Sequence, residues 1–320
     1  MGGHQPLQPD VYGRMPPAVR ELMPGVTGRR REDVYEYSTA PRVETIDETV
    51  ADWAKRSGLE VGAVQPLSEA EMAASLTQMQ ADGWCLLPDR LPAELTTDLA
   101  RSLEVAGGAE RAFGVLNTEE RSWAAASQPE ALKLARSLLG PRCRAIDAVS
   151  LLRHAGAAPE SLGADASAEL FGVVLPQVEC AWLVQTVWAL SDWEVALVPR
   201  SHHTRRAAPG ADDEPETVSL TVPAGSVLVT HGGLWQAAAA NASAELWAAL
   251  QVPFFPTWLN TWLLPDYEPL WPETLAAMPD EVASLMVGLQ GRNRGAVYEF
   301  ATEGGRSFAA ERSAVTLPRL

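Results

Sequence analysis

Residues 223–235 read PAGSVLVTHGGLW, and this stretch decides the fold. Pro223, Ala224 and Gly225 are turn residues, and the β-rich run over 226–230 that follows them is typical of a short buried strand. Short strands separated by Pro and Gly turns are the units of β-sandwiches and jelly rolls. The stretch therefore predicts a mainly β domain.

Similar runs lie on both sides of this one. They predict further strands over 143–152, 170–176, 180–190, 195–198, 218–222 and 248–255. Helical patterns dominate up to about residue 140. A capping box at 68–71 opens one helix that ends at Asp82-Gly83, Pro92 suits the first turn of a second, and 129–139 forms a third. Helices followed by many short strands predict a β-sandwich or jelly roll with a helical flank.

The chain is expected to hold one domain with an N-terminal extension. Residues 1–43 are rich in Pro, Gly and Arg and are interpreted as an irregular arm. Residues 44–320 are assigned to a single domain, with helices mainly in 44–140, a β core at about 143–256 and a C-terminal helix at about 279–289.

Composition limits the classes of function. A net charge of −16 argues against nucleic acid or an anionic membrane surface as the partner, because both require a cationic face. Three cysteines without a CxxC pair indicate a reducing compartment. Neither a signal peptide nor a membrane-spanning run is recognised, so a cytoplasmic location is expected. Lys and Arg are absent from Ala207 to Gly291.

Several segments in order carry a resemblance to a known family. They are 82–88 (DGWCLLP), 188–192 (WALSD) with 198–202 (VPRSH), the opening stretch 223–235 with Asn241, and the predicted C-terminal helix. Together they resemble the phytanoyl-CoA dioxygenase-like family of iron and 2-oxoglutarate oxygenases, over roughly residues 65–291. The resemblance implies a double-stranded β-helix, or jelly roll, with flanking helices.

The residues that the family's chemistry needs are missing. Its iron is held by an H-x-D/E unit and a distal histidine, and its 2-oxoglutarate by an arginine. None of the five histidines begins an H-x-D/E unit, and the expected location is near Leu170-Phe171-Gly172. Gln236 stands where the resemblance places the distal histidine, and Trp247 is nearest to the arginine position. We therefore expect a degenerate site without metal or cofactor.

The remaining candidates are aromatic and amide side chains. Trp188 and Trp247 are expected to line an apolar pocket, joined by a further set of candidates, namely Trp182, Phe171, Trp235 and His231. Gln236 and Gln251 are candidate hydrogen-bond donors, and Glu179 a candidate acid or base. For each tryptophan, a place in the core or in a dimer interface is the alternative. Arg153 is expected to pair with a carboxylate unless it serves the site.

These observations favour an enzyme that has lost its oxygenase chemistry. The leading hypothesis is a metal-independent, non-oxidative cyclase or isomerase for a hydrophobic natural-product intermediate, with pericyclic ring closure as one form. Two alternatives stay open. One is an oxygenase with unrecognised ligands, and the other is a non-catalytic binding or scaffold protein. A homodimer is left open. His202 is interpreted as a structural residue, because adjacent histidines on a strand point to opposite faces.

Overall fold

The computed structural model describes residues 64–105, 109–140, 143–165, 181–210, 213–256 and 270–286. All of them lie in one compact unit, Thr45–Gln290. The expectations for the 1–43 arm, for a strand at 170–176, and for Phe171 and Glu179 fall outside the described residues.

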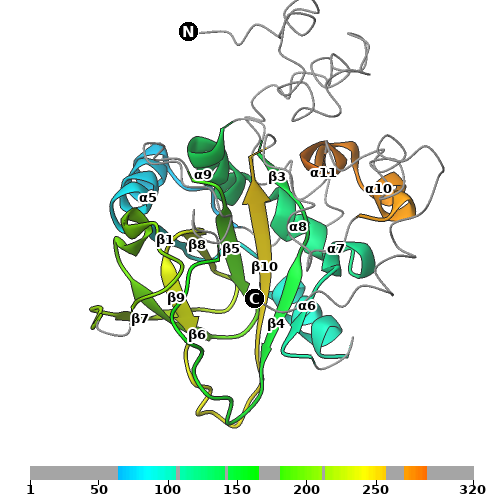
Figure 1. The fold of residues 1–320 in the computed structure, drawn as a ribbon. Coiled ribbons are helices and arrows are strands. Elements are labelled where there is room, and N and C mark those ends of the chain that lie inside the picture. The colour runs from blue at the N-terminus through cyan, green and yellow to red at the C-terminus, as the bar shows by residue number, and fades with distance from the viewer. Residues whose placement is uncertain are drawn as a thin grey trace, which may run out of the picture. The chain divides into compact units, whose positions relative to one another are not determined.

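Two antiparallel sheets form the centre of this unit (Figure 1). The larger sheet has the order β1-β8-β5-β10-β4-β2, with β3 also paired to β10, and the smaller has the order β7-β6-β9. The strands of the larger sheet are β1 (Trp84–Leu87), β2 (Arg111–Ala112), β3 (Arg144–Ala145), β4 (Val149–Arg153), β5 (Val184–Ala189), β8 (Val227–His231) and β10 (Trp247–Phe255). Those of the smaller are β6 (Trp193–Val198), β7 (Val218–Val222) and β9 (Trp235–Ala238). This is the predicted jelly roll.

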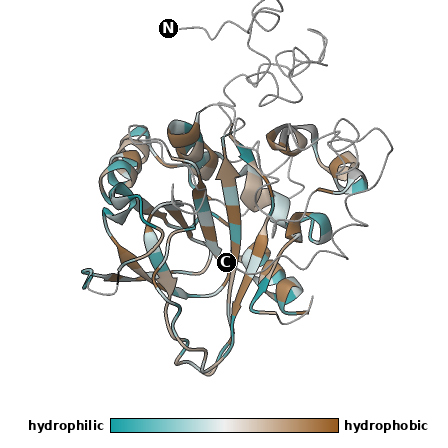
Figure 2. Ribbon diagram, in the orientation of Figure 1, coloured by the Kyte–Doolittle hydropathy of each residue, from teal (hydrophilic) through white to brown (hydrophobic). Residues whose placement is uncertain are grey.

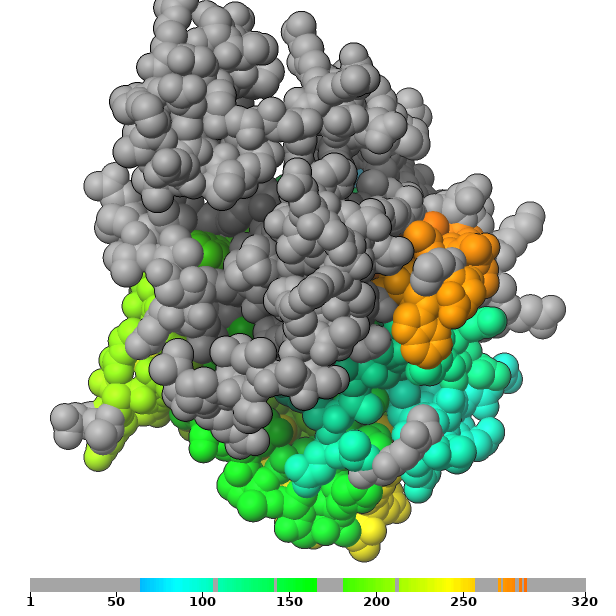
Figure 3. Space-filling model, turned by 45° about the vertical axis from the view of Figure 1, so that its right-hand side comes forward, coloured from blue at the N-terminus to red at the C-terminus, as the bar shows by residue number. Residues whose placement is uncertain are grey.

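Helices cover one face of the larger sheet. Those before the β core are α5 (Glu69–Asp82), α6 (Ala93–Val105), α7 (Val115–Thr118), α8 (Ser122–Ser127) and α9 (Pro129–Leu139), and a 3-10 helix, η1 (Ser201–Thr204), follows β6. Near the end lie α10 (Pro272–Ala277) and α11 (Asp280–Leu285), two short helices in place of the single one expected at 279–289. In Figure 3 this orange segment lies against the cyan-to-green segment, and α11 contacts α8.

Local signals explain where these elements begin and end. The Ser68 hydroxyl accepts a hydrogen bond from Glu71 N while the Glu71 carboxylate accepts one from Ser68 N, so the predicted capping box is present at the start of α5. Gly83 ends the helix in the left-handed conformation, at φ 85°. The expected strand at 143–152 is interrupted, because the buried Asp147 carboxylate accepts hydrogen bonds from Gly114 N and Ala148 N between β3 and β4.

Strand β10 separates two apolar clusters. Its residues Ala248, Leu250, Val252 and Phe254 belong to the cluster packed under the helices. Ala249 and Trp247 belong to the cluster between the two sheets. This alternation appears as brown and pale bands along the central strands in Figure 2. The inter-sheet side is the one on which the cavity described below opens.

None of the described helices is long and apolar enough to cross a membrane.

Candidate functional site

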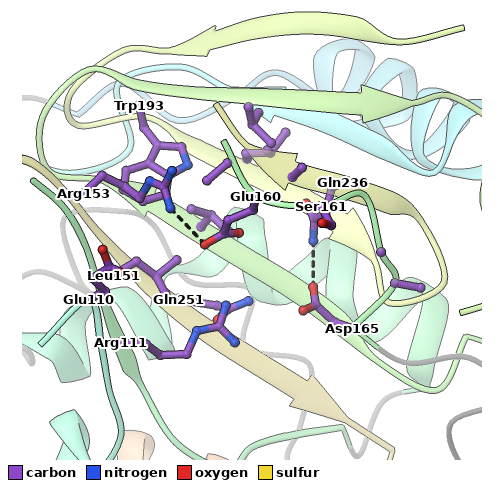
Figure 4. Close-up of a pocket in the computed structure, with 17 residues that line it drawn as sticks. Glu110, Arg111, Leu151, Arg153, Glu160, Ser161, Asp165, Trp193, Gln236 and Gln251 are labelled. Carbon is purple, nitrogen blue, oxygen red and sulfur yellow. Dashed lines mark hydrogen bonds and ion pairs between the residues drawn. The ribbon is translucent and has the colours of Figure 1, made fainter. Parts of the chain in front are cut away.

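A cavity of about 280 Å³ opens between the two sheets (Figure 4). One wall is apolar and is made by Val187 on β5, Leu228 on β8, and Trp193 and Val195 on β6. A polar wall adjoins it, since Gln251 on β10 is paired directly with Val187 on β5. The polar side chains of the lining are Glu110, Arg111, Arg153, Glu160, Ser161, Asp165, Gln236 and Gln251. A space of this size holds a small molecule rather than a polymer.

Asp165 and Gln236 form the centre of the polar wall. Gln236 Nε2 donates a hydrogen bond to Asp165 Oδ2 at 2.7 Å, drawn as a dashed line in Figure 4. The backbone supports this pair, because Gly163 forms an antiparallel bridge with Gln236 in which each N–H donates to the other's carbonyl, at 3.1 and 2.9 Å. The segment 163–165 is therefore held beside β9, and the carboxyl is presented to the cavity.

The environment of Asp165 favours its neutral form. Burial raises the pKa of the Asp165 carboxyl above its ordinary value, because the charged form loses water. The nearby Arg111 charge and hydrogen bonds with Gln236 and Gln185 act in the opposite direction and only partly offset burial. Gln185 Oε1 is itself buried without a hydrogen-bond partner among the described residues. A carboxyl with a raised pKa beside a cavity is a stronger base than an ordinary aspartate and is suited to general acid–base catalysis.

Two arginines contribute cations to the cavity. Arg153 is 5% exposed, and both of its terminal nitrogens are engaged: Nη1 lies 3.3 Å from Glu160 Oε1, and Nη2 donates to the carbonyls of Ala158 and Ala239. The expected Arg153–carboxylate pair is thus present. Arg111, on the edge strand β2, forms no ion pair with a described acidic residue. Both cations come from β2 and β4, so the cation-free span over 207–291 does not leave the cavity without positive charge.

Gln251 also lies on the cavity side, as the sequence suggested. Its side chain is 4% exposed and lines the cavity, and its amide has no hydrogen-bond partner among the described residues. Gln236 and Gln251 are therefore brought together in one cavity.

Most of the predicted aromatic residues do not line this cavity. Trp188 lies on the helix-facing side of β5, where its Nε1 donates to Thr186 Oγ1 at 3.0 Å. The expectation that it faces the interior chamber is wrong, because β5 turns Val187 and not Trp188 inward. Trp247 packs at the edge of the inter-sheet cluster, and Trp182 lies before β5 begins. Among the described tryptophans, Trp193 alone lines the cavity.

Trp235 and His231 have other surroundings. Trp235 alternates with Gln236 on β9, so it faces away from the cavity, and its Nε1 donates to Arg206 O at 2.9 Å. His231 lies in a histidine cluster, with ring centroids 5.0 Å from His202, which in turn lies 3.9 Å from His203. Burial lowers the pKa of His202 and of His231 to about 4. Neither residue lines this cavity, and their roles in substrate binding stay predictions.

The sequence reasoning missed Asp165 and Arg111. A signal for Asp165 exists: Gly163-Ala164-Asp165 has the spacing of an H-x-D unit with glycine in the first position, but a search that requires histidine passes over it. Arg111 lies on a two-residue strand that no periodicity reveals.

The residues present do not fit an iron site. An iron and 2-oxoglutarate enzyme needs two imidazoles and a carboxylate converging on one point. In the cavity, the donors near Asp165 are the amide of Gln236 and the backbone of Gly163, and the amide N–H is turned toward the carboxylate. Within the part of the chain that the structure describes, no three His, Cys, Asp or Glu residues are grouped to hold a metal ion.

Comparison with known proteins identifies the fold. No protein-family model matches the chain, and no curated protein matches it. The structure is similar to HygX from Streptomyces hygroscopicus, solved with nickel, 2-oxoglutarate and hygromycin B bound, with a TM-score of 0.51 at 14% identity over 61% of this chain and 89% of that chain.

Two further similar structures come from nogalamycin biosynthesis. They are the alpha ketoglutarate dependent epimerase SnoN (TM-score 0.49, 20% identity, 59% of this chain and 85% of that one) and the carbocyclase SnoK (TM-score 0.47, 20% identity, 61% and 88%). At these identities the likeness concerns the fold. The chain has the jelly-roll fold found in iron and 2-oxoglutarate-dependent enzymes.

Proposed function

We propose that this protein is a metal-independent, non-oxidative enzyme, a cyclase or isomerase, in which Asp165 transfers a proton to or from a small molecule in the cavity. The observation that carries the proposal is the Asp165 carboxyl, which lines a cavity, has a raised pKa and is fixed by Gln236. Hydrogen bonds from the amides of Gln236 and Gln185 hold the carboxyl in place beside the cavity.

The proposal includes an origin from a metal site of the phytanoyl-CoA dioxygenase type. Gly163, Asp165 and Gln236 would occupy the three ligand positions, because Gln236 stands at the distal histidine position and Gly163-Ala164-Asp165 has the H-x-D spacing. The backbone does not require glycine at 163, since its φ is not in the left-handed region and an added Cβ would meet only Ala207 O, at 3.7 Å. The loss of the side chain there enlarges the cavity beside Asp165.

The chemistry follows from these groups. Asp165 as carboxylate would remove a proton from a carbon next to a carbonyl, and the electron pair of the C–H bond would move to the carbonyl oxygen. Gln251, whose amide has no protein partner among the described residues, would donate a hydrogen bond to that oxygen. Return of the proton to another carbon isomerises the substrate. Alternatively, the enolate carbon attacks a second carbonyl carbon of the same molecule and closes a ring, while the π pair of that C=O bond moves to its oxygen, which takes the proton from Asp165. Neither route changes the oxidation level overall.

The walls indicate the shape of the substrate. The apolar wall with Trp193 suits a hydrophobic body, as expected for a natural-product intermediate, whereas the charged wall suits a polar end. The substrate is therefore proposed to be amphiphilic, with the reacting carbon near the boundary between the walls.

Proton abstraction by the Asp165 carboxylate can be tested without the natural substrate. In 5-nitro-1,2-benzisoxazole, removal of the C3 proton breaks the N–O bond and releases a coloured cyanophenolate. We expect the protein to accelerate this reaction without oxygen or 2-oxoglutarate and in the presence of EDTA. Asp165→Asn should lower the rate by about 100-fold, the lower range for loss of a positioned general base.

Glu104→Gln is the matched control, because Glu104 is an exposed carboxylate on α6 that lies outside the cavity lining. This variant should keep the full rate. Equal rates for Asp165→Asn and the parent protein would overturn the proposal, as would activity that requires iron and 2-oxoglutarate, which is the oxygenase alternative. No rate above buffer would favour the binding or scaffold alternative.

A further inference from the structure

The cavity holds one cation that is not paired with a described acidic residue. Arg111 lines the cavity, and it forms no ion pair or hydrogen bond through its side chain with another of the described residues. The second cation, Arg153, is occupied by Glu160 and two backbone carbonyls. In Figure 4 Arg111 extends past Gln251 toward the interior, on the side where Asp165 lies. Arg111 is exposed to solvent and also lines the cavity, so its charge is accessible to a ligand there.

The sheet register explains why Arg111 faces inward. Arg111 on β2 is paired with Leu151 on β4, and Leu151 is paired with Ala249 on β10. Ala249 in turn is paired with Ala189 on β5. Directly paired residues share one face of a sheet, and this row lies on the inter-sheet face because Leu151, Ala249 and Ala189 pack in that cluster. Arg111 therefore lies on the face of the larger sheet on which the cavity opens.

Gln251 provides a second donor near the same place. It lies one pleat further along β10 than Ala249, on the same face, and its amide is free among the described residues. A guanidinium and an amide N–H on one wall are suited to the two oxygens of a planar anion, because guanidinium donors match carboxylate geometry.

We propose that the substrate carries a carboxylate, or an equally planar acidic group, that binds Arg111 and Gln251. This inference rests on the proposed function for the role of the site and adds the class of substrate. The anion fixes the polar end of the molecule at β2 and β10, and its hydrophobic body lies along Val187, Leu228 and Trp193. A carbon near the middle of the molecule then comes within reach of Asp165.

Binding of a matched pair of probes tests this assignment. The probes are 2-naphthoate and 2-naphthamide, which have the same shape and differ in charge, and their affinities are measured by isothermal titration calorimetry. We expect naphthoate to bind about 10-fold more tightly than naphthamide, as a charge-assisted contact to an arginine provides. Arg111→Gln should reduce this preference to nearly onefold, and Arg111→Lys should keep part of it because the charge remains.

Arg101→Gln is the control, since Arg101 is an exposed arginine on α6 that contacts Asp98. It should keep the full preference for naphthoate. Equal affinity of the parent protein for the two probes, a preference that persists in Arg111→Gln, or no naphthoate binding at millimolar concentration would each overturn the assignment.

The two proposals fail separately. Asp165→Asn should lower the rate of proton abstraction by about 100-fold and keep the preference for naphthoate. If this variant stays active while Arg111→Gln loses the preference, the proposed function is wrong and the anion site stands. If Asp165→Asn is inactive while the parent protein shows no preference for naphthoate, the anion site is wrong and the proposed function stands.

Discussion

Two substitutions should install a metal site at Asp165. If Gly163, Asp165 and Gln236 hold the positions of a former facial triad, the variant Gly163→His/Gln236→His places two imidazoles beside the existing carboxylate. The backbone accepts the change at 163, because the nearest neighbour of an added Cβ is Ala207 O at 3.7 Å. At 236 the new side chain replaces an amide that already lies 2.7 Å from the carboxylate.

The expected change in the free energy of unfolding has two parts, a loss from the hydrogen bond that the variant removes and a gain from the metal ion that it binds. Without metal, removal of the Gln236–Asp165 hydrogen bond should lower the free energy of unfolding by about 1–3 kcal/mol. Ni²⁺ at about 100 times its dissociation constant should add about 2.7 kcal/mol. For a chain of this size that corresponds to a rise in Tm of about 5 °C, at roughly 2 °C per kcal/mol.

The assay is thermal unfolding with and without Ni²⁺, followed by far-UV circular dichroism. The triple variant that also carries Asp165→Asn is the control, because it retains both histidines and lacks the anionic ligand. Its Tm should respond to Ni²⁺ much less. An equal response of the double and triple variants, or no response of a folded double variant, would refute the assignment of these three positions.

Two further predictions concern stability. His202 and His231 have folded pKa values lowered to about 4, so the unfolded chain binds more protons below pH 6.5 and stability is lost as pH falls from 6.5 toward 4. After allowance for partial exposure, we expect the two histidines together to lower the free energy of unfolding by about 3 kcal/mol over this pH range. In urea unfolding, the stability of His231→Gln should depend less on pH than that of the parent protein, whereas the exposed control His154→Gln should behave like the parent. The same pH dependence for His231→Gln and the parent would contradict this prediction. Arg200 has φ 68°, a backbone conformation that favours glycine, so Arg200→Gly should raise the free energy of unfolding by about 0.5–1 kcal/mol. As the control, Arg101→Gly in α6 should lower it by about 1 kcal/mol. A less stable Arg200→Gly variant would show that the Arg200 side chain offsets the backbone strain.

Much of the fold could be predicted because its signals are local. The capping box before α5 and the turn at 223–225 each specify backbone geometry within a few residues. The strand β9 was harder to recognise, because Trp235–Ala238 contains no β-branched residue and runs into an alanine tract. The break between β3 and β4 depends on a contact from Asp147 to Gly114, which no local pattern contains.

The site was less predictable because it depends on register. Gln236 could be identified from the resemblance, which places it at the distal histidine position, and Gln251 from its place in a predicted strand. Alternate residues of a strand face opposite sides of the sheet, so the direction of a tryptophan on β5 or β10 depends on which alternate set faces the second sheet. A shift of one residue in register would turn Trp188 from the helix-facing side to the cavity side. Arg111 becomes a cavity residue only through pairing of β2 with β4, a long-range contact.

The alternation of core-facing and cavity-facing side chains along β10 links correct strand register to a correct cavity. If this strand paired one residue out of step, Gln251 would enter the helix-facing core and Leu250 would enter the cavity. The first change would bury an amide among aliphatic side chains, at a cost of about 1–3 kcal/mol, and would expose a large apolar side chain in its place. Mispaired chains would therefore be unstable as well as inactive. Correct packing of the hydrophobic core thus also ensures a correct cavity, since a chain that packs Leu250 and Phe254 properly has already placed Gln251.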